Sequence, residues 1–154
     1  MSEENTAQRN LTLQKIYVKD LSFESPNSPE VFRSEWQPQV ELNLGVRTEN
    51  VEGEVFAVIL TVSVEAKHEE RTAFLAEVQQ CCLVQISGFP EEERGPLFGS
   101  YVPNLLFPYA REAISDLVQR GGFPQLLLQP VNFDELYKRR VQEQQAAAAD
   151  STKH

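Results

Sequence analysis

Alternation of apolar and polar side chains predicts that the first half of the chain forms β-strands. Residues 40–46 place an apolar side chain at every second position, which is the period of a strand with one buried face. Residues 11–23 alternate with two changes of phase, as β-bulges would produce. Residues 54–66 are apolar on both faces over part of their length, which predicts a central strand, and residues 72–86 alternate again. Short turns predict an antiparallel meander of these strands, with an ordered irregular loop at residues 25–38.

A helical period replaces the alternation later in the chain. Residues 88–96 are predicted to form a polar connection between the last strand and the first long helix. From Leu105 to Val118 the apolar residues recur with the spacing of an amphipathic helix. Gly121 and Gly122 follow at the positions that a C-terminal cap requires. We therefore expect the first long helix to end just before these two glycines.

A second helix is predicted from its N-terminal signal. Asn132 and Glu135 have the spacing of a capping box, so this helix should begin near Phe133 and run to about Gln145. The predicted fold class is α+β, with a four-stranded antiparallel sheet followed by two C-terminal helices.

A chain of 154 residues has the length of one domain, and we assign that domain to residues 10–145. Residues 1–9 are predicted to be a flexible N-terminus. Residues 146–154 have little apolar surface to bury and are predicted to form a disordered tail.

The charge of the chain excludes some classes of partner. A formal net charge of -9 argues against nucleic-acid binding, which needs clustered Lys and Arg, and suits a basic partner or client. The chain shows no secretory leader and no long apolar run, so we expect no direct membrane insertion and a cytoplasmic location. Cys81 and Cys82 are adjacent, a spacing that closes no useful loop, and are predicted to be reduced.

No arrangement of residues predicts catalysis, a cofactor or a metal site. His68 lies in a charged turn and His154 is terminal, so both are expected to be solvated rather than metal ligands. Ser115 lacks the glycines of a hydrolase elbow. Gly121 and Gly122 are not followed by the Lys and Ser or Thr of a phosphate-binding loop, so no ATP hydrolysis is expected.

The predicted elements leave apolar surface uncovered. Two helices can cover about one face of a four-stranded sheet, whereas residues 54–66 are apolar on both faces. Soluble monomers seldom leave such a surface in water. Self-association, a ligand or an unfolded chain could each cover it, and the pattern alone does not choose among them.

Five blocks of the sequence resemble the SecB family of bacterial protein-export chaperones. They are LSFESPNSPEVF (residues 21–32), EWQPQVELNL (35–44), TAFLAEVQQ (72–80), NLLFPYARE (104–112) and GGFPQLLLQPVNF (122–133). The resemblance covers roughly residues 10–141. It implies a homotetramer, built as a dimer of dimers, whose grooves hold unfolded secretory preproteins and which docks the motor SecA.

The resemblance also implies roles for individual residues. The positions that would dock SecA are Asp20, Glu24, Leu75 and Glu77. The candidates for the client groove are Trp36, Val40, Leu42, Leu44, Phe133 and Tyr137. The candidates for the oligomer interface are Ala76, Val78, Gln80, Leu106, Tyr109, Ala113 and Leu117. The alternative for the groove set is ordinary core packing, and for the acidic docking residues it is solvated surface.

The resulting prediction is an ATP-independent holdase that keeps secretory precursors unfolded and delivers them to SecA. Reversible capture by several weak apolar contacts needs no catalysis. The alternative is a SecB-like chaperone dedicated to a single partner, such as a toxin-antitoxin system. The presence of Asp20, Glu24, Leu75 and Glu77 argues against that alternative. A small hydrolase with unrecognised acidic residues is a third, more distant reading.

Overall fold

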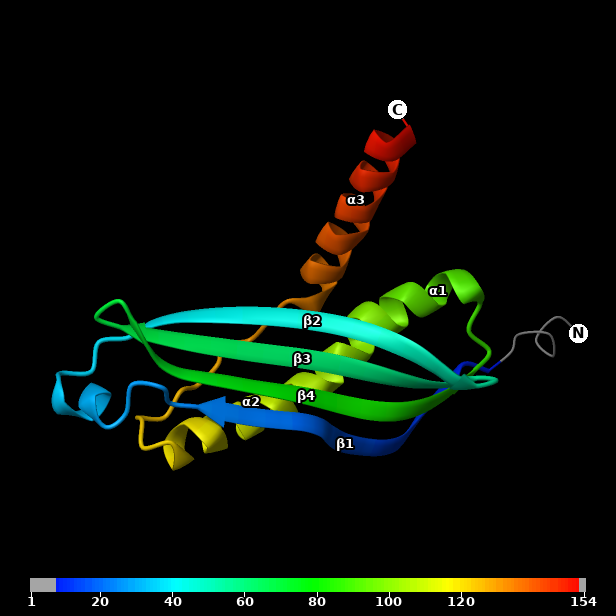
Figure 1. Cartoon of the computed structure of the whole chain (residues 1–154). Coiled ribbons are helices and arrows are strands. Elements are labelled where there is room, and N and C mark those ends of the chain that lie inside the picture. Colours follow the sequence, from blue (N-terminus) through cyan, green and yellow to red (C-terminus); the bar gives the residue numbers. More distant parts are fainter. Residues whose placement is uncertain (1–7, 153–154) are drawn as a thin grey trace, which may run out of the picture.

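Four long strands form one antiparallel sheet in a computed structural model that describes residues 8–152 (Figure 1). The strands are β1 (Asn10–Glu24), β2 (Gln39–Glu52), β3 (Val55–His68) and β4 (Arg71–Ser87). Their order across the sheet is β1-β4-β3-β2, and all neighbouring pairs are antiparallel. Figure 1 shows the helices on one side of the sheet, with α3 projecting away beyond β2.

The predicted meander is right for β2, β3 and β4 but wrong for β1. The loop after β1, which contains the short helix η2 (Glu30–Arg33), carries the chain across to the far edge of the sheet. Two hydrogen bonds fix this loop to the start of β4: Ser25 Oγ donates to the Ala73 carbonyl at 3.2 Å, and Asn27 Nδ2 donates to the Thr72 carbonyl at 2.8 Å. β1 therefore lies beside β4 in a Greek-key order.

The two changes of phase predicted in β1 are present as irregularities of its pairing with β4. The register shifts between Leu13 and Lys15, and again between Val18 and Asp20. Each shift leaves one extra residue in β1, which turns the following side chains to the opposite face. The aliphatic side chains of β1 and Phe23 consequently stay on the helix side of the sheet, whereas Tyr17 faces the other side.

The helical segment after the sheet begins earlier than predicted. It comprises α1 (Glu91–Pro96), the π-helix η3 (Leu97–Tyr101) and α2 (Val102–Arg120), so the connection predicted at residues 88–96 is wrong from Glu91 onward. The carboxylates of the first turn favour a helix start there, although they carry no apolar period. The predicted end is confirmed, because the Gly121 N–H donates to the Leu117 carbonyl at 2.9 Å and Gly122 has a φ of 91°.

The second predicted helix is α3 (Phe133–Thr152), which continues past the expected end near Gln145. At its start the Glu135 N–H donates to Asn132 Oδ1 at 3.1 Å, so the predicted capping interaction is confirmed for that bond. The domain limits and the flexibility of both ends stay predictions. Residues 1–7 and 153–154, which belong to the predicted flexible ends, lie outside the described residues.

Side chains of β3, β4 and α2 form the main core. Among the most deeply buried are Val58, Leu60, Val62, Val64, Phe74, Val78, Val84, Leu106, Ile114 and Val118. On the other face of β3, Ala57 and Ile59 pack with Cys81 and Tyr17 in a second, smaller cluster. This arrangement confirms the prediction that residues 54–66 form a central strand covered on both sides over part of its length.

His68 is buried, so the solvated position predicted for it is wrong. Its side chain lies on the same side of β3 as Ala66, toward the core. The Gln37 N–H donates to Nδ1 at 3.3 Å, and Nε2 lies 2.9 Å from Ser34 Oγ. The Trp36 ring packs 5.5 Å away. The imidazole therefore attaches the loop after β1 to the end of β3.

Asn132→Ala is expected to lower the free energy of unfolding by about 1 kcal/mol, because it removes an N-cap acceptor. Asn132→Asp should retain most of the stability, since a carboxylate oxygen can accept the same bond and suits a helix N-terminus. Urea unfolding at one fixed protein concentration measures both variants. Equal loss in both would show that the hydrogen bond to the Glu135 N–H is not what stabilises α3.

Candidate binding surfaces

The face of the sheet that α2 leaves uncovered carries the four residues predicted to dock SecA. Glu24 lies directly opposite Leu75 across the β1–β4 ladder, and Asp20 lies opposite Gln79. Glu77 follows Leu75 by two positions in β4, so both side chains point to the same face. The structure therefore brings all four candidates together on one surface, although they come from two strands that are far apart in sequence.

A shallow hollow of about 380 Å³ on this uncovered face has acidic walls. Glu24, Glu65 and Glu77 line it beside Leu75, whose side chain is 38% exposed. In the described part of the chain none of the three carboxylates forms an ion pair. An exposed apolar side chain among unpaired negative charges suits a basic partner.

An apolar strip lies on the helix side of β2, at the opposite edge of the sheet from β1. Val40 and Leu42 lie opposite Ala66 and Val64 of β3 but remain 44% and 37% exposed. Leu44, further along β2, is partly buried against the core. Three of the six groove candidates thus share one strip at a sheet edge, and two of them are open to solvent.

The other three groove candidates make contacts within the chain. The Trp36 ring lies 5.1 Å from the Phe123 ring, and Phe133 is buried in the core. The Tyr137 ring packs against Gly99, where a Cβ would collide with it. In this conformation Phe133 presents no surface to a client, whereas Trp36 and Tyr137 are partly exposed.

The candidates for the oligomer interface divide in a similar way. Four of them are buried within this chain: Ala76, Val78, Gln80 and Leu106. The other three lie on α2, where Tyr109 is half exposed and Ala113 and Leu117 are partly buried.

Other exposed apolar residues near the β1 edge are not among the predicted interface residues. Tyr101 is 54% exposed at the end of η3, and Val18 and Leu21 of β1 are each 47% exposed. The alternation of β1 marked Val18 and Leu21 as apolar but could not show that β1 is an edge strand.

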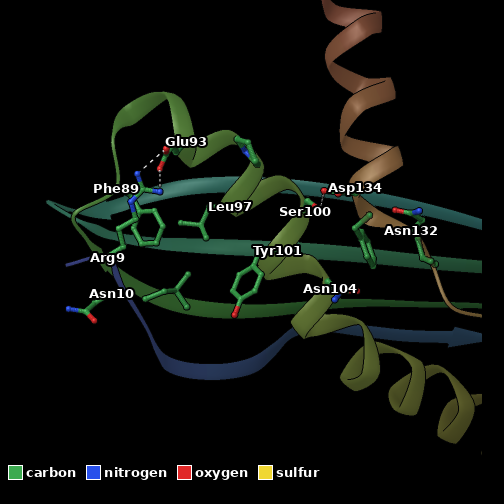
Figure 2. A pocket seen from close by; sticks show the side chains of 14 residues that line it. Arg9, Asn10, Phe89, Glu93, Leu97, Ser100, Tyr101, Asn104, Asn132 and Asp134 are labelled. Carbon is green, nitrogen blue, oxygen red and sulfur yellow. Dashed lines mark hydrogen bonds and ion pairs between the residues drawn. The ribbon is translucent and has the colours of Figure 1, made fainter. Parts of the chain in front are cut away.

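A cavity of about 1120 Å³ lies between the start of β1, the long helical segment and the start of α3 (Figure 2). At one side Arg9 Nη2 donates to Glu93 Oε1 at 3.0 Å. At the other side Ser100 Oγ donates to Asp134 Oδ1 at 2.8 Å. Figure 2 shows Tyr101 reaching toward the β1 side of the cavity. The lining comes from distant segments of the chain, so no periodic pattern in the sequence signalled it.

Both cysteines are free and buried. Burial raises the pKa of the Cys81 thiol, and burial together with Cys81 raises the pKa of Cys82 to about 11, so both thiols are protonated at neutral pH. Within residues 8–152 no group of three His, Cys, Asp or Glu side chains is placed to hold a metal ion. None of the helices in that range is long and apolar enough to cross a membrane.

Comparison with known proteins identifies the family. The family model described as preprotein translocase subunit SecB matches residues 4–144, which is most of the chain. The chain belongs to the SecB family. The prediction made from the five sequence blocks is confirmed.

Relatives named protein-export protein SecB match this SecB chain along nearly its whole length. The relative from Methylococcus capsulatus is 55% identical, and the match covers 100% of both chains. The relative from Hydrogenovibrio crunogenus is 50% identical, with 99% of both chains covered. The relative from Nitrosococcus oceani is 48% identical, with 99% of this chain and 94% of the relative covered. These identities confirm the prediction of a protein-export chaperone.

A solved structure supports the SecB fold independently. It is a SecB-like chaperone of Mycobacterium tuberculosis in complex with a peptide from an antitoxin, and it matches with a TM-score of 0.65 at 17% identity. The match covers 84% of this chain and 93% of that one. At this identity the likeness shows the fold alone, so the reading as a chaperone dedicated to a toxin-antitoxin system is not favoured. The residue assignments for SecA, client and oligomer contacts stay predictions.

Proposed function

We propose that this SecB family member is a cytoplasmic holdase that binds unfolded secretory precursors without ATP and delivers them to SecA. The observation that supports this best is the separation of two surfaces. An open apolar strip lies on the helix side of β2, and an acidic hollow lies on the opposite face of the sheet. One molecule could therefore hold a client and meet a motor protein at the same time.

Client capture would use features that only unfolded chains expose. Of the described strands, β2 pairs with β3 alone, so its outer backbone groups are free to pair with an extended chain. Val40 and Leu42 stand beside that edge and can bury apolar side chains of the client. Folded proteins expose far less free backbone and fewer clustered apolar side chains than unfolded chains, and this difference would give the selectivity that a chaperone needs.

Self-association would raise the affinity for an unfolded client further. We propose the homotetramer that the family resemblance implies. Tyr101 and Tyr109 on the helical segment and Val18 and Leu21 on β1 form exposed apolar surface that water disfavours. Several client strips on one symmetric assembly would bind one long precursor by multivalency. On this proposal the protein is not an enzyme and takes no cofactor, so another protein must release the client.

Replacing Val40 and Leu42 together by serine is expected to weaken precursor capture by about tenfold or more. Each substitution removes the apolar contact that one aliphatic side chain would make with the client. Native mass spectrometry of the protein with an unfolded precursor, without nucleotide, measures the fraction of tetramers that gain a chain. Val51→Ser is the matched control, because Val51 is 57% exposed on the same strand near the opposite end.

Circular-dichroism melts must show that the variants fold like the wild type. A wild-type tetramer that never gains a precursor would refute the holdase function. A monomer that gains one would refute only the tetramer. Equal loss of capture in Val51→Ser would show that the strip around Val40 is not the client surface.

A further inference from the structure

One side chain, His68, attaches the second half of the loop after β1 to the sheet. Within the part of the chain that the structure describes, residues 34–37 form two hydrogen bonds, and both are with the His68 ring. The Gln37 N–H donates to Nδ1 at 3.3 Å, and Ser34 Oγ lies 2.9 Å from Nε2. The bonds that fix the loop to the start of β4 come from residues 25–27 instead. His68 is therefore the polar attachment point of residues 34–37.

The bond from Gln37 requires an uncharged imidazole. A backbone N–H can only donate, so Nδ1 accepts with its lone pair, and the ring proton lies on Nε2, where it faces Ser34 Oγ. A proton on Nδ1 would point at the hydrogen of the Gln37 N–H and remove this bond. Attachment of the loop and binding of a proton thus compete for one lone pair, so a lower pH favours the released loop.

The charged groups around His68 give its protonated form little support. The hollow of about 380 Å³ beside it is lined by two acidic and two basic side chains, which are Glu30, Arg33, Glu69 and Arg71. Glu69 Oε1 lies 4.0 Å from Nε2, but the Glu69 side chain is 72% exposed, so water screens the attraction. Glu35 and Glu70 are exposed as well. The ring itself is buried, so a charge on it would lose hydration unless the loop moved and admitted water.

Trp36 lies in the attached segment and contacts the His68 ring. The two ring centres are 5.5 Å apart. The Trp36 ring also packs on two uncharged rings, Phe123 at 5.1 Å and Phe74 at 6.3 Å. Residues 34–37 lead directly into β2 and its apolar strip. The His68 ring therefore fixes the place of Trp36 and the point at which the loop meets the strip.

We propose that His68 is a positioning residue of the client groove. Its neutral ring holds Trp36 and the start of β2 in the conformation that captures a client, and protonation of Nδ1 releases them. This inference rests on the proposed function, because Trp36 is a candidate contact for the client. Unfolded precursors would then bind more weakly as the pH falls. By linkage, a bound client would oppose protonation of His68 to the same extent.

Acrylamide quenching of Trp36 fluorescence measures release of the loop, because Trp36 is the one tryptophan of the chain. The measurement is made at about pH 8 and at about pH 5.5, which lie on either side of the ordinary titration range of histidine. The quenching constant is expected to rise about twofold at the lower pH, because the released ring loses its contacts with His68 and Phe123 and meets the solvent.

An unfolded peptide whose charge is the same at both pH values measures client affinity. It is rich in Leu, Phe and Arg, has blocked ends, and contains no His, Asp, Glu or Trp. Fluorescence anisotropy with the whole protein, without nucleotide, is expected to show binding about fivefold weaker at the lower pH, which corresponds to about one lost hydrogen bond.

Two substitutions at position 68 separate the attached loop from the released loop. His68→Asn is expected to abolish the pH response of both measurements, because its Oδ1 can replace Nδ1 as acceptor and does not titrate. The amide of His68→Gln extends toward the place of Nε2 instead, so Trp36 is expected to be accessible at both pH values. His154→Asn is the matched control, since it removes the other histidine of the chain and should keep the full response.

Circular-dichroism melts must show that each variant folds like the wild type, and the wild-type response still tests the proposal if a variant at position 68 does not. Unchanged quenching of wild-type Trp36 refutes release of the loop and leaves client capture standing. The same pH response in His68→Asn assigns the titration to another group and overturns the proposal. Weaker peptide binding with unchanged Trp36 quenching refutes the positioning role. A peptide that binds at neither pH refutes the proposed function, whereas the quenching still decides whether His68 holds the loop.

Discussion

Glu77→Lys is expected to lower the affinity of this SecB chain for SecA by at least about tenfold. Glu77 shares an uncovered hollow with Glu24, Glu65 and Leu75, and none of these carboxylates has an ion-pair partner in the described residues. A lysine at this position replaces a negative charge with a positive one on the acidic surface that is proposed to contact SecA. Isothermal titration with purified SecA at two salt concentrations measures the loss and its electrostatic share.

Glu52→Lys is the matched control for this prediction, because it changes the net charge equally at an exposed position at the end of β2. It should leave SecA affinity within about twofold of the wild type. Leu75→Gln should weaken SecA binding through lost apolar contact rather than charge, with little change in its salt dependence. Equal loss of client capture in Glu77→Lys would contradict the assignment of the two sheet faces to two partners.

Leu106→Ala is expected to lower the free energy of unfolding by about 2–5 kcal/mol. Leu106 is 0% exposed in the core between α2 and the sheet, and its truncation leaves a cavity in a closely packed region. Leu127→Ala makes the same chemical change at a side chain that is 61% exposed, so it should stay within about 0.5 kcal/mol of the wild type. Urea unfolding followed by Trp36 fluorescence compares the two.

Comparing Leu106→Ala with Leu127→Ala also tests whether Leu106 acts in the core or in a subunit interface. Unfolding of an oligomer depends on protein concentration, so both variants are measured at several concentrations. A Leu106→Ala protein that kept its unfolding free energy but lost the proposed tetramer in native mass spectra would place Leu106 in a subunit contact. Because Leu106 is buried within the chain, we expect Leu106→Ala to lower the free energy of unfolding more than it weakens the proposed tetramer.

Periodicity in the sequence determined which face each strand residue occupies, but not which strands are neighbours. The alternation of Val40, Leu42 and Leu44 and the two phase changes of β1 were enough to place side chains correctly. The pairing of β1 with β4 depends on the loop after β1 and its bonds to Ala73 and Thr72, which no local pattern encodes. The Greek-key order of the strands therefore could not be predicted from the sequence pattern.

The burial of His68 and the early start of the helical segment were also hard to predict from the sequence. His68 lies beside charged residues in sequence, yet it ends a strand on the core side and contacts the Trp36 ring. The acidic start of α1 at Glu91 carries no apolar period, and the apolar side chains of Leu97 and Phe98 that hold this segment come only afterwards. In both cases tertiary packing outweighs the local pattern.

The candidate site residues show the same limit. The opposite phases of Leu75 and Ala76 in β4 correctly separated the uncovered face from the core. Phe133 and Val40 are both apolar, and only the packed structure shows that the first is buried while the second is open.

The pairing of β1 with β4 also sets when the protein becomes complete during synthesis. β2, β3 and β4 join through short hairpins that can form as they leave the ribosome, whereas Asn10 must wait for its partner Ser87. Closing that long loop costs conformational entropy before β1 and β4 make any stabilising contact, so β1 is expected to dock last. Asp20 and Glu24 arrive with β1. A nascent or partly folded copy would therefore lack two of the four residues that are proposed to dock SecA.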